Sequence, residues 1–320
     1  MKRTTIYPLY CLLMTAMVAA IMSACQYKDF DDDGDSPVDG KVPVTLHFDW
    51  QDVDSIPSLM QVMFYRGDTS GYQRFDVGNH DTTVMIRPGD YRVTAWNNDA
   101  THVYFNGYGQ REDINATTPE YNPQNAPGIR HLLDSIFPGQ KVLDYPDYMV
   151  HANKTDVVVS ENMPRTIILP ADSMVVTVDV NIGGVAGLEI VRGVKGVLGN
   201  VAGRRYMAYD NRTTDPSAVL FAARSNAADS TITARFWVFG LEPEELQDGE
   251  HKAALFFWTA GGNVFFVVDV TEQVRQAGKN PSRLTIDIPD MDVNIRDFLP
   301  QTGLDINIDD WNNREQSIGF

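Results

Sequence analysis

Apolar and polar side chains alternate along most of the chain from residue 42 onward. Between Val42 and Phe48 every second residue is apolar, and the residues between them are Pro43, Thr45 and His47. This period of two is typical of β-strands that bury one face and expose the other. The same pattern predicts further strands at 60–65, 82–86, 91–96, 155–159, 166–169, 174–182, 218–223, 231–239, 253–258, 264–270, 284–288 and 304–308.

Turn-forming residues separate the predicted strands and indicate the fold class. Glycine, proline and asparagine gather in short connections such as Arg87-Pro88-Gly89-Asp90. This spacing predicts an all-β protein of two tandem antiparallel β-sandwich domains with very little helix. We expect an N-terminal sandwich at 42–172 and a C-terminal sandwich at 173–320. Residues 106–147 interrupt the pattern and predict a long loop, with one short helix at 128–136.

The first residues resemble a bacterial secretion signal with a lipid attachment site. Lys2 and Arg3 precede a largely apolar stretch that ends in Met22-Ser23-Ala24-Cys25. This ending resembles a lipobox, in which small residues precede the cleavage site and the sulfur of the cysteine that follows takes a diacylglycerol. We predict a signal peptide at 1–24, lipidation of Cys25 and attachment to the outer membrane. The alternative is an ordinary cleavage site with a chance cysteine. The lipobox is favoured because the chain has only one other cysteine, Cys11, and that residue lies inside the signal.

Acidic residues dominate the charge of the chain. It carries 43 acidic and 26 basic residues, a formal net charge of −17, so we expect no nucleic-acid partner. Six aspartates between Asp29 and Asp39 predict a solvated acidic tether at 25–41. Asp29-x-Asp31-x-Asp33-Gly34 also matches the opening of a calcium-binding EF-hand loop, but Gly40 stands where the loop needs a glutamate. The tether resembles the signal that exports lipoproteins of Bacteroidetes to the outer face of the outer membrane.

No arrangement of catalytic residues stands out in the sequence. The six histidines have no HExxH or HxH spacing, and neither a GxSxG nor a GxxxxGK[ST] motif is present. We therefore expect no enzyme, no metal site and no cofactor. Gly193, Gly196, Gly199 and Gly203 are not followed by the Lys-Ser/Thr of a phosphate-binding loop. They predict close approach of other groups to the backbone.

A group of aromatic residues supports an alternative function, carbohydrate binding at the cell surface. Rings on a surface loop can pack against the C–H faces of sugars. The alternative interpretation is that Trp96 belongs to a core strand and the tyrosines cover a sheet edge. The candidate platform, within or beside the predicted loop, consists of Trp96, Tyr104, Phe105, Tyr108 and Tyr121.

Several residue blocks match one known family in order and spacing. They are residues 48–50, 62–65, 86–91, 96–99, 191–203, 236–240, 268–274 and 308–311. Through these blocks the chain is similar to the fimbrillin-like surface lipoproteins of Bacteroidales, a family catalogued as a domain of unknown function. Members of this group include lipid-anchored base subunits of fimbriae. The resemblance implies two β-sandwiches of transthyretin-like topology, a non-enzymatic surface role and a fimbrial subunit as partner.

The same resemblance implies a distinction between anchoring and polymerising subunits. Polymerising relatives lose their lipidated first segment by cleavage after an arginine beyond the first strand, and a strand of the next subunit fills the groove. Here no arginine or lysine lies between Val42 and Tyr65, and Arg66 is the first arginine after Cys25. We therefore predict that the lipidated segment is retained and that the protein anchors or terminates a fimbria.

Five short sequences resemble the O-glycosylation signal of Bacteroidetes envelope proteins. In each, an aspartate precedes serine or threonine, and an apolar residue or threonine follows. Chance alone would supply two or three such matches in this chain. The predicted attachment sites are Ser55, Thr82, Ser135, Ser173 and Ser230.

Overall fold

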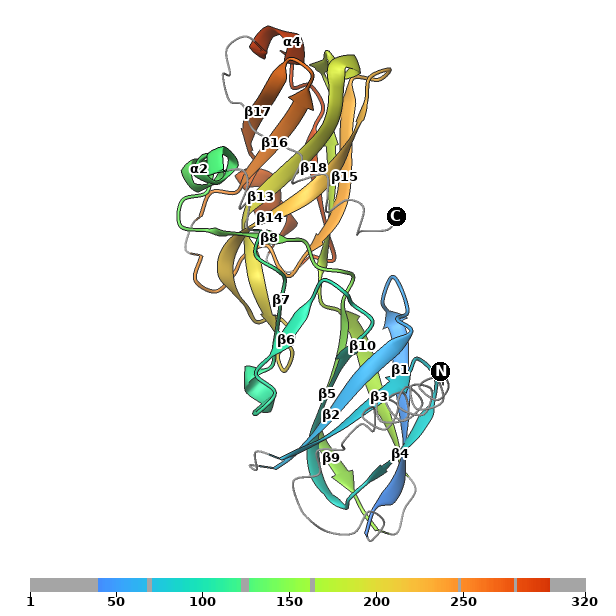
Figure 1. Ribbon diagram of the computed structural model, residues 1–320. Helices are drawn as coiled ribbons and strands as arrows, with labels where there is room; N and C mark the ends of the chain where they lie inside the picture. The colour runs from blue at the N-terminus through green and yellow to red at the C-terminus, as the bar shows by residue number, and fades with distance from the viewer. Residues whose placement is uncertain are drawn as a thin grey trace, which may run out of the picture. The chain divides into compact units, whose positions relative to one another are not determined.

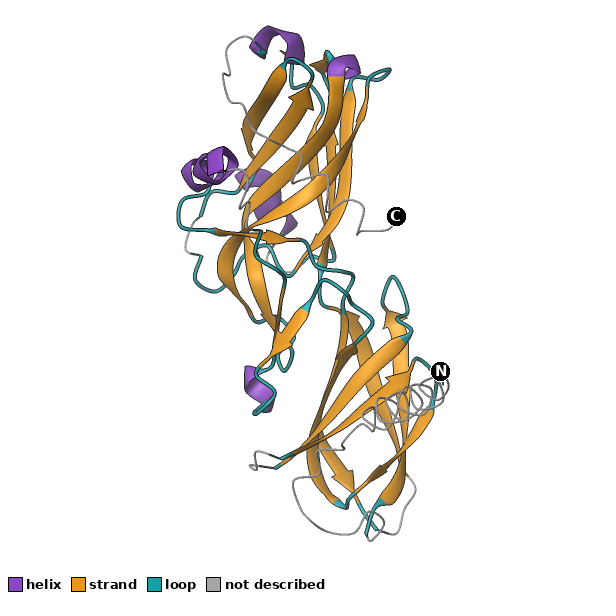
Figure 2. Ribbon diagram, in the orientation of Figure 1, coloured by secondary structure: helices purple, strands orange, loops and turns teal. Residues whose placement is uncertain are grey.

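The computed structural model describes residues 40–67, 71–121, 127–161, 165–246, 249–278 and 281–299. About 58% of the described residues are in strands and 10% are in helices, so the protein is all-β as predicted (Figure 2). The predicted signal peptide, Cys25, the tether up to residue 39 and the strand at 304–308 lie outside the described residues. In the described part of the chain, no helix is long and apolar enough to cross a membrane.

The first sandwich has two layers that share a corner. The four-stranded layer has the order β3-β2-β5-β9, and the three-stranded layer has the order β10-β1-β4. The layers join where β9 pairs with β10 at three positions only. The strands are β1 (Val42–Asp52), β2 (Leu59–Arg66), β3 (Tyr72–Gly78), β4 (Thr82–Ile86), β5 (Gly89–Asn97), β9 (Val150–Val159) and β10 (Arg165–Ser173) (Figure 1).

Strand β1 lies in the middle of the three-stranded layer. It pairs in parallel with β10 on one side and antiparallel with β4 on the other. Val44, Leu46 and Phe48, the predicted apolar face, are buried in a core to which both layers contribute. The parallel pair differs from the predicted antiparallel arrangement, because the alternation of apolar residues carries no information about strand direction.

The second sandwich repeats this plan. Its layers have the orders β17-β16-β13-β14 and β15-β11-β18, and β14 pairs with β15 at three positions. Strand β11 lies between antiparallel β15 and parallel β18, as β1 lies between β4 and β10. The strands are β11 (Val176–Ile182), β13 (Val191–Tyr206), β14 (Thr213–Asn226), β15 (Thr231–Val238), β16 (Lys252–Thr259), β17 (Gly262–Asp269) and β18 (Arg283–Ile288).

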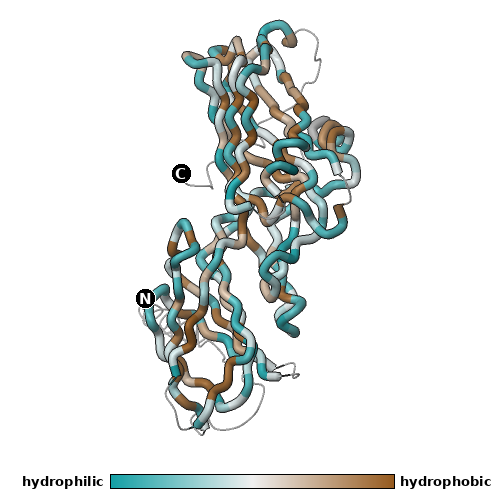
Figure 3. Tube along the Cα trace, turned by 180° about the vertical axis from the view of Figure 1, so that it is seen from behind, coloured by the Kyte–Doolittle hydropathy of each residue, from teal (hydrophilic) through white to brown (hydrophobic). Residues whose placement is uncertain are grey.

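Aliphatic and phenylalanine side chains fill the core of the second sandwich. The stacked rings of Phe221 and Phe236 have centroids 4.3 Å apart. Val274 from α3 (Thr271–Ala277) and Ile295 from α4 (Ile295–Phe298) complete this core. Apolar and polar positions alternate along the strands in Figure 3. Shorter elements are β12 (Val185–Ala186), η2 (Leu188–Ile190) and β19 (Val293–Asn294), of which β12 and β19 pair with each other.

Residues 106–147 differ from the predicted long loop. Strand β6 pairs with β7, β7 pairs with β13, and β8 pairs in parallel with β14, so these strands extend the sheet of the second sandwich. Strands of three or four residues are too short to show a period of two. The boundary at 172/173 stays a prediction. Strands β6, β7 and β8 precede it in the chain but belong to the sheet of the second sandwich. The elements are β6 (Tyr104–Asn106), η1 (Arg111–Asp113), β7 (Asn115–Thr117), α2 (Pro127–Ile136) and β8 (Lys141–Asp144).

Candidate functional site

The outer face of the layer β3-β2-β5-β9 carries an ordered grid of polar and aromatic side chains. Strand register places Tyr65 of β2 opposite Tyr72 of β3 and Arg92 of β5. Because side chains alternate between the two faces of a sheet, residues two positions apart share a face. The grid therefore consists of Tyr72, Arg74 and Asp76 on β3, Tyr65, Met63 and Gln61 on β2, Arg92, Thr94 and Trp96 on β5, and Asn153 and His151 on β9.

A segment from the second sheet, which we call the connector (residues 104–114), covers much of this face. The connector contains β6 and η1. The hydroxyl of Tyr65 donates a hydrogen bond to the carbonyl oxygen of Tyr108 at 3.0 Å. Arg111, 7% exposed, donates from Nε to Thr94 Oγ1 at 2.8 Å and from Nη2 to Asn153 Oδ1 at 3.2 Å. These bonds hold the connector against β2, β5 and β9.

The five aromatic residues of the predicted platform do not form one exposed surface. Trp96 is fully buried, with its ring centroid 5.3 Å from that of Phe105 and 6.3 Å from that of Tyr108. Tyr121 is 7% exposed and belongs to a different cluster, under α2. Tyr104 is 56% exposed on β6. The platform prediction is therefore wrong for Trp96 and Tyr121, because the connector covers the ring of Trp96 and Tyr121 packs with side chains of α2. The alternative interpretation, in which Trp96 belongs to a core strand, is confirmed.

One row of the grid remains exposed beyond the connector. Tyr72 is 39% exposed, and the side chains of Arg74 and Asp76 are 36% and 31% exposed. Arg74 Nη2 donates to Asp76 Oδ1 at 3.3 Å and to Asp76 Oδ2 at 3.2 Å. Sequence reasoning missed these residues, because the segment 72–78 has only two clear apolar positions, Phe75 and Val77.

The phenol groups beside this row are perturbed by their surroundings. Burial raises the pKa of Tyr108, an effect that Arg74 and a hydrogen bond with Gln61 oppose and that Tyr72 and Asp76 reinforce. Burial, together with Tyr72 and Tyr108, raises the pKa of Tyr65 well above its ordinary value. Tyr72, Arg74 and Asp76 therefore lie within electrostatic reach of the Tyr108 hydroxyl.

A buried polar network continues from the grid toward the second sandwich. Asn153 Nδ2 donates to the carbonyl oxygen of Met207 at 2.8 Å and lies 3.3 Å from Nδ1 of His151. Burial, followed by the charge of Arg205, lowers the pKa of His151 to about 3. Burial also lowers the pKa of Arg205 to about 10. The imidazole is therefore neutral at pH 7 and acts as a structural group.

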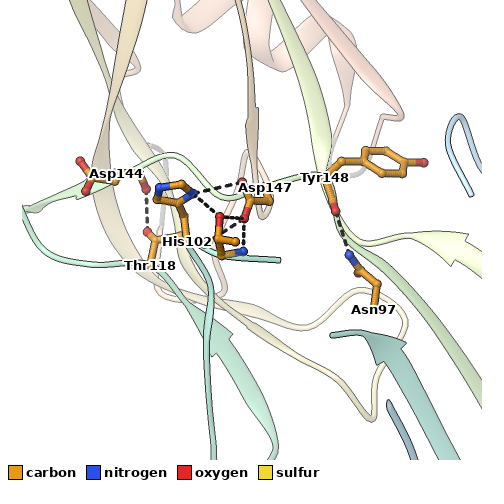
Figure 4. A network of polar contacts seen from close by, with 7 residues as sticks. Asn97, His102, Thr118, Asp144, Asp147 and Tyr148 are labelled. Carbon is orange, nitrogen blue, oxygen red and sulfur yellow. Dashed lines mark hydrogen bonds and ion pairs between the residues drawn. The ribbon is translucent and has the colours of Figure 1, made fainter. Parts of the chain in front are cut away.

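A second polar network fixes the loop that connects β8 to β9 (Figure 4). Asp147 Oδ2 accepts hydrogen bonds from the backbone nitrogens of Thr101 at 2.6 Å and His102 at 2.9 Å. The carbonyl oxygen of Tyr148 accepts a bond from Asn97 Nδ2 at 3.2 Å. These contacts are local and structural. In the described part of the chain, no group of three His, Cys, Asp or Glu side chains is arranged to hold a metal ion.

Comparison with known families gives the classification. The family described as "Domain of unknown function (DUF5119)" matches residues 24–222. The chain belongs to this family. Its DUF5119 region includes the whole first sandwich and the connector, and therefore every residue of the grid. No curated protein matches the chain.

Three solved structures are similar to this DUF5119 protein to different degrees. A candidate adhesin from Bacteroides ovatus ATCC 8483 has 19% identity and a TM-score of 0.62, with 82% of this chain and 97% of that one covered. A candidate polysaccharide-binding protein (DUF1812) from Bacteroides thetaiotaomicron VPI-5482 has 10% identity and a TM-score of 0.49, covering 79% and 93%. The fimbrial anchor protein Mfa2 from Porphyromonas gingivalis has 14% identity and a TM-score of 0.46, covering 77% and 90%. The first likeness confirms the predicted fold class.

The predicted O-glycosylation sites occupy varied positions in the fold. Ser55 and Ser135 are exposed, whereas Thr82, Ser173 and Ser230 are half-buried. The hydroxyl of Ser173 donates to the carbonyl oxygen of Val175 at 3.0 Å. Modification at these sites stays a prediction.

Proposed function

We propose that the protein is a lipid-anchored outer-membrane protein that faces the cell exterior and acts by protein–protein contact, as an anchor or accessory subunit of a fimbria. The lipobox-like ending at Cys25 and the acidic tether support this location. The resemblance to fimbrillin-like lipoproteins supports the role, and the fold shared with a candidate adhesin agrees with it. No enzymatic activity is part of the proposal.

The position of β1 carries the proposal that the protein anchors and does not polymerise. β1 pairs with strands on both sides, and its Val44, Leu46 and Phe48 are at most 4% exposed. Cleavage at Arg66, the first arginine after Cys25, would remove both β1 and β2. That loss would take inner side chains from both layers of the first core, whereas loss of β1 alone would open a single groove.

Mass spectrometry of the protein isolated from the cell surface tests this proposal. We expect peptides from residues 42–65 in the mature protein and a diacylglycerol-modified Cys25. Replacement Cys25→Ser should release the protein from the membrane fraction, because a single lipid site carries the hydrophobic attachment. The matched control is Cys11→Ser, which changes a residue of the removed signal and should leave fractionation unchanged.

Two results would contradict the proposal. A dominant mature N-terminus at or beyond residue 51 would make the protein a polymerising or tip subunit. Membrane association that persists in Cys25→Ser with undiminished palmitate labelling would exclude the lipid anchor at this residue.

A further inference from the structure

The exposed row on β3 has side chains of two complementary kinds. Tyr72, Arg74 and Asp76 lie at alternate positions of one strand, so all three project from the outer face of the sheet. The strand is at the end of its layer, and the connector covers the neighbouring rows on β2 and β5 (Figure 1). The row therefore presents one aromatic ring and one charged pair to solvent.

The ring of Tyr72 packs beside a fixed aromatic group on the neighbouring strand. Its centroid lies 5.6 Å from that of Tyr65, with 46° between the planes. Tyr65 is 2% exposed, and its hydroxyl is held by the carbonyl oxygen of Tyr108. A ring that packs against an immobile neighbour loses little conformational freedom when a ligand covers its outer side, which favours binding.

The Arg74–Asp76 pair offers hydrogen bonds without net charge. One guanidinium nitrogen bonds both carboxylate oxygens, at 3.2 and 3.3 Å, and Asn98 Nδ2 lies 3.5 Å from Asp76 Oδ1. The remaining N–H groups of Arg74 can donate, and the remaining lone pairs of Asp76 can accept. Hydroxyl groups, which donate and accept, match this combination.

We propose that Tyr72, Arg74 and Asp76 form a binding site for a neutral oligosaccharide. The C–H face of a pyranose packs on the ring of Tyr72, and its hydroxyl groups bond to Arg74 and Asp76. The neutralised pair and the net charge of −17 disfavour sulfated or sialylated glycans. This site goes beyond the proposed anchoring role and does not depend on it, since binding is measured on the chain itself.

An extended peptide strand that adds to the outer edge of β3 is the other partner that this location could accept. Strand addition uses backbone groups at the edge of a sheet and needs no particular side chains on its outer face. The structure favours the sugar, because the ring of Tyr72 and the Arg74–Asp76 pair lie on the face of the sheet and not along its backbone edge. Binding of sugar probes that depends on the Tyr72 side chain therefore tests the proposed partner.

The experiment uses the full-length protein with the Cys25→Ser replacement, which removes the predicted site of acylation. Isothermal titration calorimetry measures binding of four neutral probes, maltohexaose, cellohexaose, xylohexaose and mannohexaose, with 3′-sialyllactose as an acidic comparison. We expect at least one neutral probe to bind. Tyr72→Ala should weaken that binding by about tenfold or more, and Tyr72→Phe, which keeps the ring, should retain it.

The matched control is Tyr209→Ala in the second sandwich. Tyr209 is 37% exposed, similar to Tyr72, and has the guanidinium of Arg212 5.2 Å from its ring centroid. This variant should bind the sugar as the parent does. If Tyr72→Ala fails to fold, Arg74→Met provides the second variant and should also weaken binding.

Three outcomes would overturn the proposal. The first is the absence of binding to all four neutral probes at 10 mM, a concentration at which even weak sugar sites are occupied, being about tenfold above a millimolar Kd. The second is binding that is unchanged in folded Tyr72→Ala and Arg74→Met. The third is preference for sialyllactose, which would indicate an anion site.

Discussion

His151 shows how a single titratable side chain affects the stability of this protein. It is 2% exposed, and burial lowers its pKa from 6.5 to about 3, with a further contribution from Arg205. The His151 imidazole therefore stays neutral in the folded protein, whereas in the unfolded chain it binds a proton below about pH 6.5. In that range the unfolded state carries more protons, so the free energy of unfolding decreases as the pH falls.

We predict that this acid sensitivity disappears when His151 is replaced. In the parent protein, His151 should contribute a loss of up to about 1.4 kcal/mol for each pH unit between 6.5 and 3, and no loss above pH 7. His151→Gln should flatten this part of the pH profile, at some cost in stability at pH 7. Urea unfolding at a series of pH values measures both effects.

The control for this prediction is His131→Gln on the exposed side of α2. Its pH profile should match that of the parent. An unchanged slope in His151→Gln would show that other groups cause the acid sensitivity.

At the scale of elements, the glycines of β13 explain how this 16-residue strand packs. A Cβ atom at Gly196 would lie 2.0 Å from the ring of Phe221, and one at Gly193 would lie 2.3 Å from the ring of Trp258. At Gly199 it would meet Phe137 at 2.4 Å. The prediction that these glycines permit close approach is confirmed. The approaching groups are aromatic rings at these three positions and the hydroxyl of Ser217, at 2.4 Å, at Gly203.

We predict that Gly196→Ala destabilises the protein by about 3 kcal/mol, because the added methyl group must displace a ring in a packed core. Gly109→Ala is the control, since a Cβ atom there has no neighbour within 4 Å and its backbone is not in the left-handed region. Chemical denaturation should detect a lower midpoint in the first variant only. Equal stability of the two variants would contradict this account of β13.

Side chains close some of the sheet edges in the described part of the chain. Gln273 of α3 accepts from the backbone nitrogen of Asp287 at 2.8 Å and donates to its carbonyl oxygen at 3.3 Å, as a neighbouring strand would. Lys154 of β9 donates to the carbonyl oxygen of Ile168 on β10 at 3.0 Å. Occupied backbone groups cannot pair with a foreign strand, so these side chains limit unspecific association at β18 and β10.

At the scale of the whole molecule, apolar and polar contacts join the two sheets. One core cluster contains Met63 and Trp96 of the first sandwich together with Met207 and Phe239 of the second. Residues 40–320 accordingly form one compact unit. Arg111 connects this cluster to the first sandwich through Thr94 and Asn153.

We predict that the parent protein unfolds in one cooperative thermal transition. Arg111→Ala should lower stability by about 3 kcal/mol, because Thr94 and Asn153 lose their buried partner, and should separate the unfolding of the two sandwiches. Differential scanning calorimetry measures both effects. Arg130→Ala, at an exposed position on α2, should behave like the parent. Two transitions in the parent would show that the joint does not couple the sandwiches.

The positions of most strands could be predicted from the sequence alone. Whether one strand face is buried depends on residues two positions apart, so alternation at Val44, Leu46 and Phe48 was sufficient to predict β1 and its buried side. The direction of its neighbour β10 could not be predicted, nor the pairing of β7 and β8 with the second sandwich. Pairing depends on contacts between distant residues, about which local periodicity contains no information.

The exposure of individual aromatic residues was decided only by the tertiary structure. From sequence, Trp96 and Tyr108 both belonged to the candidate platform, with a core-strand position as the alternative for Trp96, and Tyr72 was not recognised as part of a strand. The connector packs over the ring of Trp96 and leaves that of Tyr72 in contact with solvent. The first ring is therefore fully buried, and the second is 39% exposed. Composition and spacing could indicate which side chains are able to contact a ligand. Which of them reaches solvent depended on the path of a segment that is distant from β3 in sequence.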